Sequence, residues 1–272
     1  MEGERLVPSD RFDASTDLDR SENPFSDEGR YDGSWSAFFI IDRQYQMSEH
    51  LAGDLFCHYC GLNEAMLMPR LADYLRYEAA QNRNKIVACP PSIRHDDLIR
   101  QALEETPAQE FIRTTDPRWI IHSTTLDRGK RILSDGAIKS QQLLLEEGCL
   151  SDHQPGYVSF REPTDYLNHV NFGAITSPWA EAVVRSNQTG EFASFDQPYK
   201  PGIRFYVDAH KLIEDRRVLR VGAPHLKAEG LVLLQDYVVG WVSADDFPEH
   251  TEWTPISFTK AADELFLSLH RE

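Results

Sequence analysis

Residues 119–138 read Trp-Ile-Ile-His-Ser-Thr-Thr-Leu-Asp-Arg-Gly-Lys-Arg-Ile-Leu-Ser-Asp-Gly-Ala-Ile, and this stretch decides the fold. A short apolar strand runs into a polar cluster at a helix start. Thr125 or Ser123 can cap the helix, and Gly136 supplies its left-handed end. Polar side chains at a strand end are either hydrogen-bonded structural groups or parts of a ligand site. His122 is therefore a candidate for either role.

Composition is that of a globular protein. The chain has 272 residues, of which 41% are hydrophobic and 11% aromatic, enough for one large domain or two modest ones. The sequence contains no run of about eighteen apolar residues and no signal-peptide pattern at its start. Four unevenly spaced cysteines indicate no disulfide framework. We expect a cytoplasmic protein without a membrane partner.

Charge is concentrated at the N-terminus. The formal net charge is −16, and residues 1–34 hold ten acidic and four basic side chains, a net of −6 that leaves −10 for the rest. Non-specific nucleic-acid binding depends on Lys and Arg that neutralise phosphates, so this balance argues against a dedicated DNA or RNA groove. The composition predicts a disordered acidic tail over residues 1–33.

The next region is expected to be mostly helical, over residues 34–115. Its first apolar run, 35–41, is compatible with a strand or with a helix start. From Glu49 to about Arg83 the apolar residues recur at helical spacing, and another helix is expected to begin near Ser92.

After Arg118 the pattern changes to short strands separated by turns, with few long helices between them. That alternation favours a mixed, mainly antiparallel α+β domain over residues 116–272. The expected strands are 119–122, 157–160, 203–207, 218–221, 229–234 and 237–242, and the expected helices are 125–135 and about 178–187.

Cys57-His-Tyr-Cys60-Gly61 has the form of a zinc knuckle, in which two thiolates bind one ion. A second pair of ligands is needed, and Cys89 and His95 are the available candidates. The alternative is that these cysteines are small core side chains. The sequence leaves both interpretations open.

Two further segments carry candidate site residues. Gly156-Tyr-Val-Ser-Phe-Arg161 places Tyr157 and Ser159 on one side of a strand. Lys227-Ala-Glu-Gly-Leu-Val-Leu-Leu234 leads a single carboxylate, Glu229, into an apolar strand, where it is unfavourable unless exposed, paired or functional. An exposed edge position and a catalytic role both fit Glu229.

Taken in order, these segments resemble the ADP-ribosyltransferase superfamily, and most closely the DarT-type DNA ADP-ribosyltransferase toxins, over residues 118–250. The resemblance implies an ADP-ribosyltransferase-like split sheet with short helices, and NAD as substrate. It implies that Glu229 and Arg161 are catalytic and that His122, Ser123, Thr124, Tyr157 and Ser159 bind NAD.

One departure concerns the catalytic cation. DarT-type toxins carry a basic segment with a catalytic Arg between the first two elements, whereas residues 140–156 contain no Arg or Lys. Arg161 and Arg185 are the nearest replacements. This departure and the negative charge leave the acceptor open among protein, nucleic acid and small molecules.

The expected activity is an NAD-dependent ADP-ribosyltransferase, a toxin or effector that a partner protein could regulate. Cleavage of the nicotinamide glycosidic bond passes through an oxocarbenium-like state, which the Glu229 carboxylate would stabilise. Tyr157 would stack on the nicotinamide ring. Two alternatives remain: an inactive nucleotide- or ADP-ribose-binding module, and an acidic interaction protein of the inhibitor or immunity type.

Overall fold

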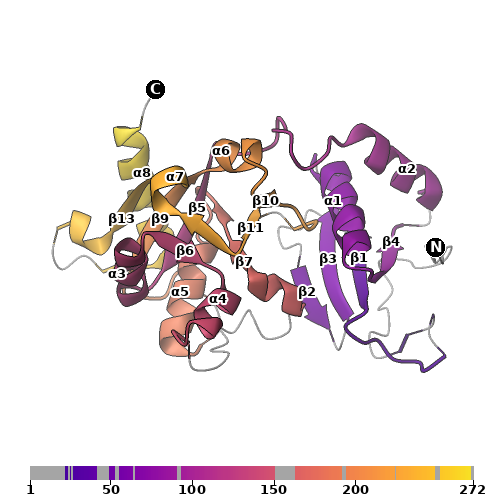
Figure 1. Cartoon of the computed structure of the whole chain (residues 1–272), viewed down its shortest axis with the longest axis horizontal. Helices are drawn as coiled ribbons and strands as arrows, with labels where there is room; N and C mark the ends of the chain where they lie inside the picture. The colour runs from indigo at the N-terminus through magenta and orange to yellow at the C-terminus, as the bar shows by residue number, and fades with distance from the viewer. Residues whose placement is uncertain are drawn as a thin grey trace. The chain divides into compact units, whose positions relative to one another are not determined.

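The computed structural model describes residues 22–23, 25, 27–41, 49–52, 55–63, 65–90, 93–150, 163–191, 194–223, 225–248 and 252–270. The chain divides into two compact units (Figure 1). No helix in these ranges has the length and apolar content that a bilayer span needs. Unit 1 consists of Met1–Gln109, Arg161–Pro163 and Arg220–Pro224, and unit 2 of Glu110–Phe160, Thr164–Leu219 and His225–Glu272.

Unit 1 is built on a four-stranded sheet, so the expectation of a mostly helical region over 34–115 is wrong. The strand order is β2-β3-β1-β4; β1 runs parallel to β3 and to β4, and β2 runs antiparallel to β3. Helices α1 and α2 contact each other, and α1 also contacts β1, β3 and β4. The elements are β1 (Trp35–Ile41), β2 (Glu49–Ala52), β3 (Leu55–Gly61), α1 (Leu67–Ala80), β4 (Asn84–Ala88) and α2 (His95–Glu105).

The error has a physical cause. Strand β1 is buried on both faces: Phe38 packs in the cluster with α1 and α2, and Phe39 packs in a second cluster on the other face. Strands buried on both faces read as continuous apolar runs without alternation. Such runs cannot be distinguished from buried helix by periodicity. The helical spacing read over 49–83 is confirmed only for α1, where Pro69 occupies the first turn and disturbs no hydrogen bond.

Cys57 and Cys60 lie on opposite faces of β3. Both are buried, Cys57 in the cluster that contains Phe39 and Cys60 in the cluster that contains Leu71. Since residues three apart in a strand point to opposite sides, the two thiols cannot bind one ion together. The knuckle interpretation therefore fails on geometry, and the cysteines are core side chains.

Part of the segment predicted to be a tail is packed. The ring of Phe25 stacks on Trp35 with centroids 6.0 Å apart, and Tyr31 meets the same ring edge-on at 6.1 Å. Tyr31 is buried. Residues 1–21 lie outside the ranges given above.

The described residues of unit 2 form three antiparallel sheets, which confirms the mixed α+β class (Figure 1). The largest has the order β13-β9-β5-β8, the second β10-β11-β7, and the third pairs β12 with β6. The strands are β5 (Trp119–Thr124), β6 (Ala137–Lys139), β7 (His169–Asn171), β8 (Gly173–Ala174), β9 (Ile203–Asp208), β10 (Val218–Leu219), β11 (Lys227–Glu229), β12 (Leu231–Leu233) and β13 (Val238–Ser243).

The strand-helix-glycine unit predicted from 119–138 is confirmed. Thr125 is the N-cap residue of α3, but its side chain makes no capping hydrogen bond and Ser123 bonds Glu181 instead, so the expected side-chain cap is not present; Gly136 ends the helix with a left-handed φ of 71°. The helix expected near 178–187 is α5. The helices are α3 (Leu126–Asp135), α4 (Gln141–Glu146), η1 (Thr164–Asn168), α5 (Trp179–Thr189), α6 (Ala209–Glu214), α7 (Leu234–Tyr237), η2 (Ala244–Asp246) and α8 (Pro255–Leu269).

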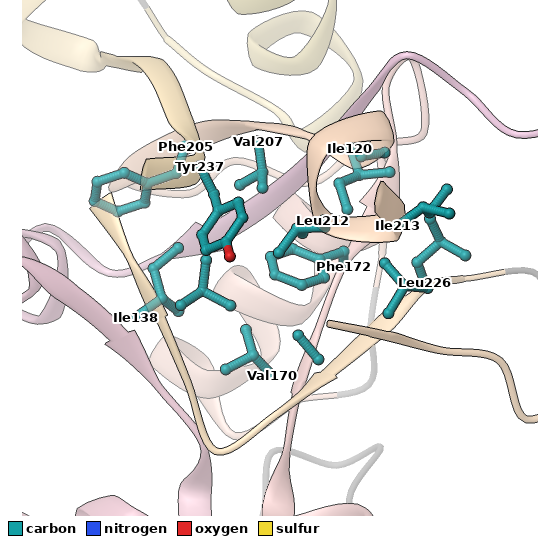
Figure 2. Packing of buried hydrophobic residues seen from close by; sticks show 14 of the residues in the cluster. Ile120, Ile138, Val170, Phe172, Phe205, Val207, Leu212, Ile213, Leu226 and Tyr237 are labelled. Atoms are coloured by element: carbon teal, nitrogen blue, oxygen red, sulfur yellow. The ribbon is translucent and has the colours of Figure 1, made fainter. Parts of the chain in front are cut away.

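The strands β5 and β9 are buried on both faces. On one face Ile120, Phe205 and Val207 pack with side chains from β7, β11 and β12, as Figure 2 shows for most members of this cluster. On the other face Ile121 and Tyr206 pack with residues of α8. Successive residues of β5 therefore point alternately into two different interiors.

Candidate active site

His122 lies on the face of β5 that points toward β7. Its half-buried ring donates a hydrogen bond from Nδ1 to the backbone oxygen of Asn171 at 3.3 Å. The ring also meets Phe172 edge-on, with centroids 6.4 Å apart. Burial lowers the pKa of His122, and the Asn171 hydrogen bond only partly opposes this. The imidazole is thus neutral at neutral pH, and Nε2 is left as a hydrogen-bond acceptor.

Glu229 ends β11, and its side chain is exposed. In the antiparallel pair of β11 with β7, Glu229 lies opposite His169, and Lys227 lies opposite Asn171. Through its three residues, β7 therefore contacts His122 of β5 and pairs with Glu229 of β11. The two contacts are separated by two residues of β7, about 7 Å of strand. Within the described ranges no hydrogen bond or ion pair joins the side chains of Glu229 and His122 directly.

A cluster of polar side chains surrounds Glu229 on the same face. Lys227 is two residues earlier in β11, so it shares the face of Glu229. It is only 1% exposed, and its Nζ lies 3.3 Å from the ring centroid of Tyr166 in η1. His169 meets the Tyr166 ring edge-on at 6.3 Å. Tyr166, His169 and Lys227 were not among the candidates that the sequence suggested. The one signal for them was the spacing Lys-Ala-Glu, which places the lysine beside the carboxylate.

Ser123, a predicted NAD-binding residue, points away from His122. Its hydroxyl donates a short hydrogen bond to the buried Glu181 of α5 and lies 3.5 Å from the guanidinium of Arg204. The structure therefore separates the two polar residues that the sequence grouped. Thr124 shares the face of His122 and is half-buried.

The network around Ser123 is fully buried in its centre. Arg204 on β9 is 0% exposed and binds Asp263 of α8 through Nε at 2.9 Å and Nη2 at 3.2 Å. Its Nη1 lies 3.3 Å from Glu181. Tyr199 donates to Glu181 at 2.7 Å, and Tyr206 donates to Asp263 at 2.8 Å. One cation thus faces two carboxylates, and hydroxyl donors together with the backbone N–H of Thr176 supply further hydrogen bonds.

The other predicted site residues fall into two groups. Tyr157, Ser159 and Arg161 lie outside the described residues, as does the whole segment 151–162. Arg185, the second candidate for a catalytic cation, is buried on α5 and pairs with Glu191 at 2.6 Å. Lys227 is the buried cation on the face of Glu229.

A half-open cavity of about 300 Å³ lies between the start of α5 and α8, lined by Pro178, Ile256 and Leu267 among others. It borders Asp263, and therefore lies on the face of the β5–β9 sheet opposite to His122. In the ranges that the structure describes, no three His, Cys, Asp or Glu side chains form a group that could hold a metal ion. Comparisons with protein-family models, with curated proteins and with solved structures found no match to this chain.

Proposed function

We propose that the chain is an NAD-dependent ADP-ribosyltransferase whose active site is built around β7. One observation carries the proposal. The backbone of Asn171 contacts His122 on β5, while His169 pairs with Glu229 on β11. The backbone position on β7 that contacts the neutral imidazole and the position that pairs with the exposed carboxylate are thereby about 7 Å apart along one strand.

The arrangement suits cleavage of a nicotinamide glycosidic bond. Departure of nicotinamide leaves positive charge on the ribose carbon and ring oxygen, as in glycoside hydrolysis. The Glu229 carboxylate would stabilise that charge, and it would contribute more to the transition state than to bound NAD. An exposed carboxylate beside a strand end is accessible to a substrate of this size.

His122 and Thr124 are proposed to bind the substrate rather than to react with it. Nε2 of the neutral His122 can accept a hydrogen bond from a ribose hydroxyl, and Thr124 lies on the same face of β5. Ser123 is assigned a positioning role, because its hydroxyl is bound to Glu181 on the opposite face. Lys227 takes the place of the cation that Arg161 or Arg185 was expected to supply.

The test is incubation of the purified chain with NAD labelled in its adenylate part and with a cell extract. Nicotinamide release and label transfer are followed together, for the wild type and for Glu229→Gln. Glu214→Gln, which removes an exposed carboxylate on α6, is the matched control. Removal of one well-placed electrostatic group costs about a hundredfold to a thousandfold in rate. Release and transfer should fall by this factor in Glu229→Gln and stay unchanged in Glu214→Gln.

Other outcomes identify other classes of protein. Binding of NAD or ADP-ribose without turnover would identify a binding module. Indifference to NAD, together with steeply salt-dependent binding to a basic protein, would identify an acidic interaction protein. Either result would overturn the proposed activity. The labelled product would show whether the acceptor is protein or nucleic acid.

A further inference from the structure

His169 is placed next to the proposed reaction centre by the pairing of two strands. It lies opposite Glu229, so the Cβ atoms of the two residues are about 4.5–5.5 Å apart. Its ring is 8% exposed and borders the Tyr166 ring. A nucleophile that attacks the ribose carbon of NAD next to the Glu229 carboxylate would therefore also lie next to the imidazole of His169.

One nitrogen of the His169 ring is buried and unused. Among the described residues, Nδ1 of His169 has no hydrogen-bond partner.

The charges around His169 keep it ready to accept a proton. Burial is the largest effect and lowers the pKa of His169, and the Lys227 ammonium lowers it further. The carboxylates of Asp165 and Glu229 act in the opposite direction without reversing the shift. The imidazole is therefore neutral at neutral pH.

Strand β6 and helix α4 also pack against β7, and both carry charged residues. Lys139 on β6 is bound to Asp135 at 3.2 Å and to Glu147 at 2.7 Å. Glu146 on α4 accepts a hydrogen bond from Gln142. None of these charged side chains is among the groups that shift the pKa of His169.

We propose that His169 is the general base of the transfer step, and that it takes the proton of the acceptor nucleophile as the ribose carbon is attacked. This inference rests on the proposed function. The bond from the ribose C1 to the nicotinamide nitrogen breaks, and its electron pair leaves with nicotinamide. A bond forms from C1 to the oxygen or nitrogen of the acceptor, and the proton of that atom passes to the His169 imidazole and then to solvent. The acceptor class is thus a neutral O–H or N–H nucleophile that has to lose a proton.

The roles of Glu229 and His169 can be tested separately, because the two residues serve different steps of the reaction. Glu229 is needed for nicotinamide to leave, whatever the nucleophile. His169 is needed only when the nucleophile carries a proton. Azide is an anion with no proton to lose, so it should react with the ribose carbon without a base.

The experiment measures NAD turnover by the full chain in water and in azide, for wild type, His169→Gln, Glu229→Gln and His210→Gln. A general base contributes about a hundredfold to ten-thousandfold, so His169→Gln should lose at least a hundredfold in water and leave the KM for NAD unchanged. Azide should restore nicotinamide release in His169→Gln, with 1-azido-ADP-ribose as product, and should not restore it in Glu229→Gln. His210→Gln, on α6, should behave as the wild type.

Three results would overturn the inference. A His169→Gln protein as active as the wild type in water would remove the base role and leave the proposed function standing. A slow variant that azide does not restore would give His169 a structural role only. A wild type that releases no nicotinamide would remove the proposed function and the base with it.

A second measurement does not depend on the variant's folding. In wild-type protein, the imidazole of His169, followed by NMR from pH 5 to 8, should be neutral at pH 7. A protonated His169 at pH 7 would contradict the proposal.

Discussion

Glu229 and His169 are opposite each other in the β7–β11 pair, and Lys227 projects from the same face. A carboxylate, an imidazole and a buried ammonium are thus fixed by backbone pairing rather than by loop conformation. Sites built on strands hold their side chains more precisely than sites on loops.

The buried network of Arg204 should be essential to stability. Replacement of Arg204 by Met leaves the carboxylates of Glu181 and Asp263 without their cation, and loss of one partner of a buried ion pair costs about 3–5 kcal/mol. The control is Arg118→Met, which removes an ion pair with Asp208 from a side chain that is 51% exposed. Exposed pairs contribute about 0–1 kcal/mol. Equal loss in the two variants, measured by urea denaturation, would refute the assignment.

Substitution of Ser123 should lower stability and leave NAD binding unchanged, whereas substitution of Thr124 should weaken NAD binding with little effect on stability. Ser123→Ala removes a donor from the buried Glu181, which costs about 1–3 kcal/mol, and should leave the Kd for NAD unchanged. Thr124→Ala should weaken NAD binding without lowering the unfolding free energy by a comparable amount. Calorimetric titration and denaturation of both variants decide this. If Ser123→Ala weakened NAD binding and Thr124→Ala did not, Ser123 rather than Thr124 would be the residue that binds NAD.

Gly202 should tolerate no side chain. A Cβ at this position would lie 1.8 Å from the carbonyl oxygen of Thr124, so the end of β5 would have to move. Overpacking costs about 1–3 kcal/mol, occasionally more. Gly202→Ala should therefore lower both stability and NAD binding, whereas Gly33→Ala, which meets no atom within 4 Å, should change neither. A stable Gly202→Ala protein with normal binding would show that the close approach is not required.

Much of the β5 region was predictable because its signals are local. An apolar strand, a polar helix start and Gly136 at a left-handed position lie within twenty residues, and each has its own chemistry. The carboxylate of Glu229 was noticeable because an acidic residue beside an apolar strand is unusual.

The remaining features of the fold and of the candidate site have no local signal in the sequence. β6, β7 and β8 have three, three and two residues, too few for a periodic pattern. His169 matters only through its pairing with Glu229, sixty positions later in the numbering, and no pattern in the sequence reports that register. In unit 1, the run that contains Phe38 and Phe39 fits a strand or a helix start equally well, because both faces of β1 are apolar.

Stability should fall as the pH falls below about 6.5, the ordinary pKa of an unfolded histidine. The pKa values of His122 and His169 are lowered in the fold, mainly by burial, so the unfolded chain takes up their protons first. Their contribution to stability is complete above 6.5 and is lost as the pH drops toward the folded-state values. Calorimetric Tm values between pH 5 and 8 check this. The double variant His122→Gln, His169→Gln should show a flatter dependence, and an equally steep one would contradict the assignment.

The most direct test of the account is the rate of nicotinamide release from NAD by the purified chain, compared with that of Glu229→Gln. The account predicts release by the wild type and a loss of about a hundredfold or more in the variant, with an unchanged Tm. A folded wild type that releases no nicotinamide, or a variant that keeps more than half of the activity, would contradict it.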